Sequence, residues 1–269
     1  MALKGRIGLA GGGNMGSALL KGMLGSGLVK ADQVVVAEKL ASRAGQLQSD
    51  LGVATVAACS ELGGLDVLIL AVKPNDVAEA AREAAAGLGP ESLVITLAAG
   101  VRLATVAQAL PQGQPLVRAM PNTPALIGKG VTAICGGPGL EARHLETAAQ
   151  VFGAVGRVVT VQEKHMDAVT ALSGSGPAYV FVIIEALADA GVNQGLDRET
   201  AVALAAHTVA GAAQLLIDSG QHPGELKDRV ASPGGTTIAG LRELERGGLR
   251  GVLFNAIEAA TRRSKELGG

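Results

Sequence analysis

The chain has 269 residues, which suffice for one large domain or two domains of ordinary size. Its 23 basic and 24 acidic residues give a net charge of −1, which argues against a nucleic-acid-binding protein and against attraction to anionic membranes. The two cysteines, Cys59 and Cys135, fit no metal or redox spacing, so we expect free thiols, no metal site and a soluble cytoplasmic protein.

The segment up to residue 162 alternates short β-branched runs with helical stretches. Its early strands are continuous apolar runs, the pattern of strands covered on both faces in a parallel sheet. Helical segments between them imply right-handed crossovers. The sequence therefore predicts an α/β fold with a Rossmann-like, doubly wound domain over residues 1–162. The expected strands are 6–10, 33–38, 53–57, 66–72, 92–97, 115–119, 131–135 and 157–161.

From residue 163 the β pattern stops, and residues 163–269 are predicted to form an all-helical domain. The expected helices are 178–190, 198–218, 223–231, 236–246 and 249–267. They are apolar nearly all round, which is typical of buried helices, yet so short a bundle cannot bury them within one monomer. We therefore expect this domain to form the interface of a homo-oligomer. Segment 201–217 falls short of the roughly 20 apolar residues of a membrane span and is predicted to be a buried helix.

A glycine-rich turn follows the first predicted strand. Gly11, Gly13 and Gly16 fit Gly-x-Gly-x-x-Gly with a strand before the motif and a helix after it. The three glycines permit a tight turn, close approach of a pyrophosphate, and packing of the helix on the strand, in that order. Backbone N–H groups at the helix start, where Asn14 and Met15 lie, attract phosphate. The turn predicts a dinucleotide site, with a purely structural turn as the alternative.

The end of the second strand is the place where Rossmann domains read the adenosine ribose. Glu38 could accept the ribose 2′-hydroxyl, which favours NAD. Lys39, Ser42 and Arg43 could instead hold a 2′-phosphate, which favours NADP, or be solvated loop charges. The cofactor is therefore expected to be NADP or NAD, with the preference open.

Two more strand ends are expected to border the cofactor, because ligands of open α/β sheets bind beyond the carboxyl ends of the strands. Lys73 could contact cofactor or substrate, or only cap a loop. The expected cofactor-binding residues here are Ala71, Val72, Lys73 and Pro74 after the fourth strand, and Ala99 and Gly100 after the fifth.

Two small-residue segments of the second half suggest a substrate site. One spans 172–179 and contains Ser175, and the other spans 231–238 just before a predicted helix. The second presents hydroxyl and N–H donors without an acidic residue, which suits a small carboxylate. Ordinary helix capping by Ser232 or Thr236 is the alternative.

Several of these motifs together resemble one family. They are 11–16 (Gly-Gly-Gly-Asn-Met-Gly), 71–74 (Ala-Val-Lys-Pro), 118–124 (Arg-Ala-Met-Pro-Asn-Thr-Pro), 172–179, 222–228 and 232–237 (Ser-Pro-Gly-Gly-Thr-Thr). Over nearly its whole length the chain resembles the pyrroline-5-carboxylate reductases, which catalyse the last step of proline synthesis. It departs from them at Gly12, where the family more often has Ala or Cys, and at the Glu38-Lys39 pair.

The resemblance implies an NAD(P)H-binding Rossmann domain and a helical domain that forms a homodimer, often assembled into a decamer. It implies that the small-molecule substrate, 1-pyrroline-5-carboxylate, is bound by Ser232, Gly235, Thr236 and Thr237. In this interpretation Thr237 contacts the ring nitrogen and the other three hold the carboxylate. The resemblance also places the segment containing Asn122 beside the nicotinamide, although two prolines could make it a structural turn.

Two other classes of protein compete with this interpretation. A β-hydroxyacid dehydrogenase shares the architecture, but it would need a lysine that segment 178–192 lacks. A non-catalytic dinucleotide sensor would need the glycine turn but not the donor segment. His165, His207 and His222 have no carboxylate partner nearby in sequence and are expected to be structural.

Overall fold

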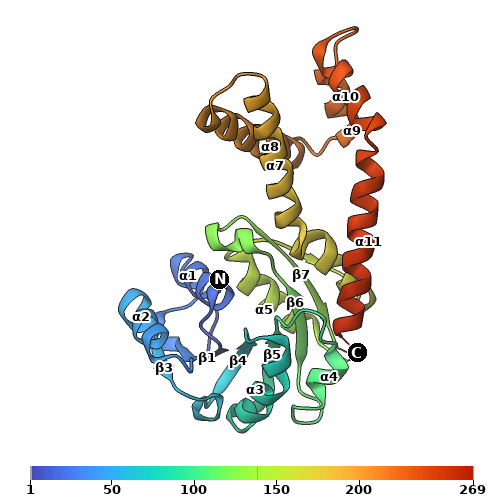
Figure 1. The fold of residues 1–269 in the computed structure, drawn as a ribbon. Helices are drawn as coiled ribbons and strands as arrows, with labels where there is room; N and C mark the ends of the chain where they lie inside the picture. Colours follow the sequence, from blue (N-terminus) through green and yellow to red (C-terminus); the bar gives the residue numbers. More distant parts are fainter. Residues whose placement is uncertain (1, 138, 269) are drawn as a thin grey trace. The chain divides into compact units, whose positions relative to one another are not determined.

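The computed structural model describes residues 2–137 and 139–268 and contains one eight-stranded sheet (Figure 1). All eight strands predicted from the sequence are confirmed. The strands are β1 (Ile7–Ala10), β2 (Val34–Ala37), β3 (Ala54–Val56), β4 (Leu65–Leu70), β5 (Leu88–Thr96), β6 (Leu116–Met120), β7 (Gly130–Gly136) and β8 (Gly156–Thr160).

The strand order is β3-β2-β1-β4-β5-β6-β7-β8, and the first six strands are all parallel. This is the doubly wound Rossmann order, in which the carboxyl ends of the strands share one edge. The pairing of β6 with β7 is antiparallel. The link from Met120 to Gly130 holds only the short 3₁₀ helix η5 (Thr123–Ile127), and it is too short for the dozen or so residues of a parallel crossover.

Helices cover both faces of the sheet, as the continuous apolar strands predicted. Alternate strand residues divide between two cores: Leu9 and Ile69 pack in one, and Leu68 and Val94 in the other. The first core includes residues of α1 and α5, and the second includes residues of α3 and α4. The helices of this part are α1 (Asn14–Gly25), α2 (Ala41–Leu51), α3 (Val77–Ala84), α4 (Leu103–Ala107), α5 (Ala142–Gly153) and α6 (Met166–Val169).

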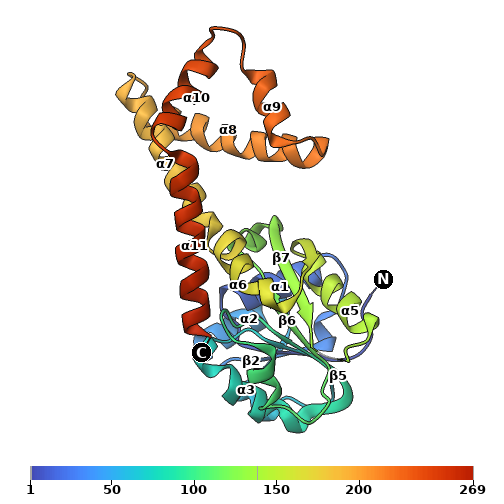
Figure 2. The same cartoon turned by 90° about the vertical axis from the view of Figure 1, so that its right-hand side faces the viewer.

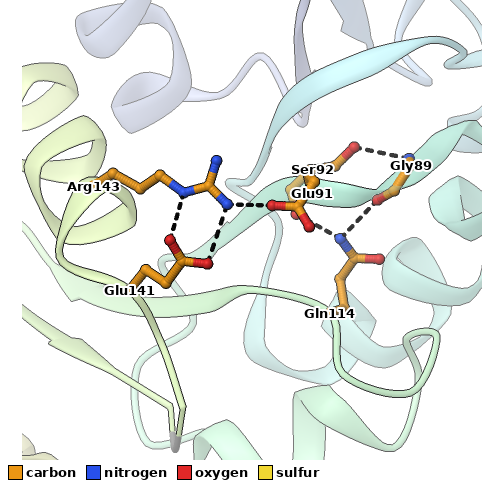
Figure 3. Close-up of polar contacts among 6 residues, drawn as sticks. All are labelled: Gly89, Glu91, Ser92, Gln114, Glu141 and Arg143. Atoms are coloured by element: carbon orange, nitrogen blue, oxygen red, sulfur yellow. Dashed lines mark hydrogen bonds and ion pairs between the residues drawn. The ribbon is translucent and has the colours of Figure 1, made fainter.

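A polar cluster ties the beginning of β5 to its neighbours, at the edge opposite the carboxyl ends (Figure 3). Gln114 donates to the carbonyl oxygens of Gly89 and Ser92, so the loop before β6 is fixed to β5. Arg143 at the start of α5 pairs with both Glu91 and Glu141. Each of these exposed ion pairs contributes little stability, and they lie away from the carboxyl ends of the strands, where ligands of such sheets bind.

The remaining helices are α7 (Gly176–Asn193), α8 (Arg198–Ser219), α9 (Pro223–Val230), α10 (Thr236–Arg246) and α11 (Leu249–Leu267), and they confirm the five helices predicted for this region (Figure 2). α7 packs on α8 through a small cluster of Ala188, Ala201 and Ala205. Most other apolar side chains are exposed, among them Phe181 at 67% and Phe254 at 77%.

The prediction that segment 201–217 is buried is wrong for the single chain. Only 11% of the most apolar window of Arg198–Ser219 is buried, and the corresponding share for Glu163–Asn193 is 17%. Both segments are long and apolar enough to cross a membrane by length and composition alone, which is weak evidence for a span. The physical reason for the exposure is that one chain offers too little surface to cover helices that are apolar nearly all round.

The chain divides into two compact units. The first holds the residues up to Ser175 together with those from Ala260 on, and the second is Gly176–Ala259. This division differs from the predicted one between residues 162 and 163. Met166 is fully buried in the core of the first unit, and the Ser264 hydroxyl donates to Asp167 at 2.7 Å, so both flanking segments pack with the sheet.

Candidate active site

A cavity of about 640 Å³ lies at the carboxyl edge of the sheet, within the first unit. Nine of the predicted cofactor-binding residues line it: Gly11, Gly13, Asn14, Met15, Glu38, Lys39, Ala71, Val72 and Lys73. They come from the ends of β1, β2 and β4 and from the first turn of α1. The fold thus brings together residues that are far apart in the sequence.

The glycine turn leaves space where a phosphate group would lie. Gly11 has φ +97°, and a Cβ there would lie 2.8 Å from the carbonyl oxygen of Ala71. A Cβ on Gly16 would lie 2.3 Å from the carbonyl oxygen of Gly11, so that glycine permits α1 to pack on the turn. Gly13 is the N-cap of α1, with no side-chain cap among the described residues, and a Cβ on it would meet open space. The N–H groups of this helix start are arranged to receive a pyrophosphate.

Glu38, at the end of β2, is held by three donors. Its Oε2 accepts the Gly12 N–H at 3.0 Å and an Arg43 guanidinium N–H at 3.3 Å, and its Oε1 accepts the Leu40 N–H at 2.9 Å. The Glu38 side chain is only 6% exposed, whereas that of Arg43 is 44% exposed. Arg43 also lines the cavity, so its charge faces the predicted cofactor site; the alternative of a solvated loop charge does not describe it.

Five of the predicted cofactor-binding residues do not line this cavity. Gly16 is buried beneath the turn, and Pro74 begins the short 3₁₀ helix before α3. Asn122 accepts the Val131 N–H at 2.9 Å through its side-chain oxygen, so it fixes η5 to β7. Ala99 and Gly100 form the turn after β5, and Gly100 contacts the last turns of α11.

The cavity also has an acidic wall that sequence reasoning missed. Asp76, Glu79 and Glu83 line it from α3 and the residue before it, at a spacing that puts them on one helical face. That spacing, directly after β4, was a signal that could have revealed them.

Burial raises the pKa of the nearby Cys59 thiol to about 11, with a further raising effect of Glu83, so this thiol stays protonated.

Two of the predicted segments meet beside the cavity. Met120 and Pro121 line it, whereas Asn122 beyond them does not. A Cβ on Gly174 would lie 2.6 Å from the Met120 Cε, so the segment containing Ser175 packs directly against Met120. Residues Thr170–Gly174 form a π-helical turn, a feature that is frequent at functional sites.

The predicted substrate donors lie at the start of α10, in the second unit. The N-cap of α10 is Gly235, and no side chain caps this helix in the described part of the chain. Capping by Ser232 or Thr236, the alternative left open above, is therefore not observed. Ser232 and Thr236 are exposed and Thr237 is half-buried, so a helix start with three hydroxyl groups remains available to an anion.

The three histidines considered above differ from one another. The Nδ1 of His222 accepts the Gly224 N–H at 3.1 Å and caps α9, which confirms a structural role. His165 and His207 are exposed on the single chain, so a structural role for them stays a prediction. No histidine is among the residues that line the cavity, and none lies in segment 231–238, which holds the predicted substrate donors.

The fold and the cavity together define a Rossmann-type dinucleotide-binding oxidoreductase with an additional helical unit. Residues 163–267 match the family described as pyrroline-5-carboxylate reductase dimerisation, and residues 6–100 match that described as NADP oxidoreductase coenzyme F420-dependent. The chain is 43% identical to the pyrroline-5-carboxylate reductase of Methanosarcina acetivorans over 98% of each chain.

Solved structures agree with the sequence match. A pyrroline-5-carboxylate reductase from Coxiella burnetii has a TM-score of 0.93 at 34% identity, with 99% of this chain and 100% of that chain covered. A pyrroline carboxylate reductase from Plasmodium falciparum, solved with NADP bound, has a TM-score of 0.88 at 30% identity over 100% of both chains. The chain belongs to the pyrroline-5-carboxylate reductase family.

Gly13→Ala tests the phosphate site without disturbing the fold. Because the added methyl group meets open space in the protein itself, we expect a melting temperature close to that of the wild type. The same methyl group points at the pyrophosphate position, so we expect the Kd for NADPH, measured by calorimetry, to rise at least about tenfold. Gly25→Ala, at the other end of α1 and also in open space, is the matched control and should change neither quantity. Unchanged NADPH affinity in Gly13→Ala would exclude this turn as the phosphate site.

Proposed function

We propose that this protein reduces 1-pyrroline-5-carboxylate to L-proline with NAD(P)H, as the last step of proline synthesis. The observation that carries the proposal is the coexistence of a dinucleotide cavity and an acid-free donor segment on an uncapped helix start. Sequence identity of 43% to a pyrroline-5-carboxylate reductase over nearly the whole chain supports it.

The first unit supplies the residues that would hold the cofactor. The N–H groups from Gly13 to the first turn of α1 bind the pyrophosphate. The turn after β4, which contains Lys73, borders the same cavity. Met120 and Pro121 line the part of the cavity nearest to the segment that contains Ser175. NAD(P)H supplies the hydride, and these residues supply its position.

The second unit supplies the residues for the substrate. The Ser232 hydroxyl and the Thr236 N–H hold the carboxylate, and the Thr237 hydroxyl contacts the ring nitrogen. The Gly235 N–H, predicted as a further carboxylate donor, donates to the Ser232 carbonyl oxygen at 3.1 Å in the structure. A cyclic imine is protonated from solvent near neutral pH, so the site requires no strong general acid. A donor set made of hydroxyl and N–H groups, without a histidine or carboxylate, fits this chemistry.

We also infer that the exposed apolar faces of α7, α8 and α11 are covered by a second copy of this chain. The family model that matches residues 163–267 is described by its dimerisation, and Phe181 and Phe254 are too exposed for a lone chain in water. Dimers of this kind could assemble further into a decamer. A homodimer that covers these helices also accounts for the membrane-like apolarity of α7 and α8, in what we propose to be a soluble cytoplasmic enzyme.

Two alternatives are disfavoured by particular observations. A β-hydroxyacid dehydrogenase would place a lysine on the first helix of the second unit, and α7 contains none. A dinucleotide sensor without activity would not require the hydroxyl and N–H donors at the uncapped start of α10.

The reaction is tested by following NADPH and NADH oxidation with 1-pyrroline-5-carboxylate and identifying the product. We expect turnover with formation of L-proline. Oxidation of a hydroxy acid with NADP in place of this reaction would support the dehydrogenase, and dinucleotide binding without any turnover would support the sensor.

Thr237→Ala removes the proposed hydroxyl contact to the ring nitrogen. We expect kcat/KM for 1-pyrroline-5-carboxylate to fall at least about tenfold, roughly 1.4 kcal/mol of transition-state stabilisation. Thr237→Ser keeps the hydroxyl group and should retain most of the activity. Wild-type kcat/KM in Thr237→Ala would remove this residue from the reaction.

A further inference from the structure

We propose that Arg118 is a positioning residue, whose ion pair with Glu163 sets the place of segment 163–175 beside the cavity. Arg118 opens segment 118–124, one of the motifs that carry the family resemblance, yet it does not line the cavity itself. This role deepens the proposed function and rests on it, because segment 163–175 ends at Ser175, next to the part of the cavity that Met120 lines.

Arg118 is a buried charge in the middle of β6. It is only 3% exposed. Leu116 and Met120, two residues before it and two after it, contribute to the second core, so by the alternation of a strand its side chain faces the same core. A guanidinium group stays charged in proteins, and a buried charge is costly unless it is paired. Packing alone would favour an apolar residue at this position.

Glu163 is the ionic partner of Arg118, and no other is found in the described part of the chain. The Arg118 Nη1 lies 3.6 Å from the Glu163 Oε1, which also accepts the Leu103 N–H at 2.6 Å. Both charges reach Cys135, which is opposite Arg118 on β7. Burial, and to a lesser degree Glu163, raises the pKa of this thiol to about 11, whereas Arg118 lowers it. The ion pair thus joins the sheet, the start of α4 and segment 163–175.

The other end of the segment lies at the cavity. Glu163 begins a short 3₁₀ helix, and the chain continues without a gap through α6 into the π-helical turn. The Ser175 N–H donates to the Thr170 carbonyl oxygen of that turn at 2.8 Å. At this end the segment packs on Met120, two residues after Arg118 on the same strand. β6 therefore holds the beginning of the segment through Arg118 and its end through Met120.

Two further contacts hold the middle of the segment independently of the ion pair. The Met166 side chain is fully buried in the second core, and Asp167 accepts the Ser264 hydroxyl at 2.7 Å. Loss of the ion pair should therefore displace the ends of the segment without unfolding it. A displacement of about 1 Å near reacting groups can lower a rate about a hundredfold. The phosphate site, on the turn between β1 and α1, has no contact with this segment through the pair, so cofactor affinity should change little.

The test compares Glu163→Gln, Arg118→Lys and the double variant Arg118→Met/Glu163→Gln with the wild-type protein. Glu163→Gln keeps an oxygen atom for the Leu103 N–H but removes the charge. The double variant removes both charges, so no unpaired charge is left in the core. Glu91→Gln, which removes an exposed ion pair with Arg143 at the opposite edge of the sheet, is the matched control.

Three quantities are measured: kcat with 1-pyrroline-5-carboxylate, the Kd for NADPH, and amide hydrogen exchange by mass spectrometry. In Glu163→Gln and in the double variant we expect kcat to fall at least about tenfold and the Kd to change less than about twofold. Exchange should become faster in peptides that contain residues 170–175 and stay unchanged in those of β1 and α1. Arg118→Lys keeps the charge and should retain part of the activity, and Glu91→Gln should match the wild type.

A merely structural ion pair gives a different result. Wild-type kcat in the folded double variant would overturn the inference, even at a lower melting temperature, and so would a parallel loss of NADPH affinity. If the wild-type protein itself failed to reduce 1-pyrroline-5-carboxylate, the proposed function would fail. The exchange comparison would then still decide whether the ion pair holds residues 170–175 in place.

Discussion

The whole site depends on the close approach of a backbone turn to two phosphate groups. Such an approach requires positions without a Cβ: Gly11 because of the Ala71 carbonyl, Gly13 because of the ligand, and Gly16 because of the turn itself. It also requires the turn to keep its shape without the ligand. The buried carboxylate of Glu38, which accepts the Gly12 N–H, provides that support from the neighbouring strand. The order of β1, β2 and β4 in the sheet follows from the same requirement, because their ends surround the turn.

The two units divide the chemistry between them. The first carries a cavity with charged walls and a helix start that attracts phosphate. The second carries a helix start with hydroxyl groups and no acid, which suits a small carboxylate imine. Its α7, α8 and α11 expose apolar side chains that one chain leaves uncovered, so the unit that carries the proposed substrate donors is also the one proposed to meet a partner. The proposal therefore assigns oligomerisation and substrate binding to the same part of the chain.

The sequence predicted the elements well because each has a clear local signal. Buried parallel strands are continuous apolar runs, and Gly220 ends α8 in the left-handed conformation that favours glycine. Features that depend on distant neighbours were missed. The direction of β7 and the hydrogen bond that Asn122 accepts from the Val131 N–H depend on where the chain returns. The position of Glu38 could not be inferred either, since its charge is equally compatible with a ribose contact and with support of the turn. Burial of α8 was predicted wrongly for the single chain, because apolarity indicates that a helix is covered but does not reveal which chain covers it.

The central claim is that a dinucleotide held on the glycine turn delivers hydride to the imine carbon of a cyclic amino acid precursor. The most direct measurement uses NADPH carrying deuterium at the transferable position of the nicotinamide, with mass spectrometry of the product. The account predicts L-proline that contains one deuterium atom, bound to the former imine carbon. Unlabelled proline, or cofactor oxidation without proline, would contradict it.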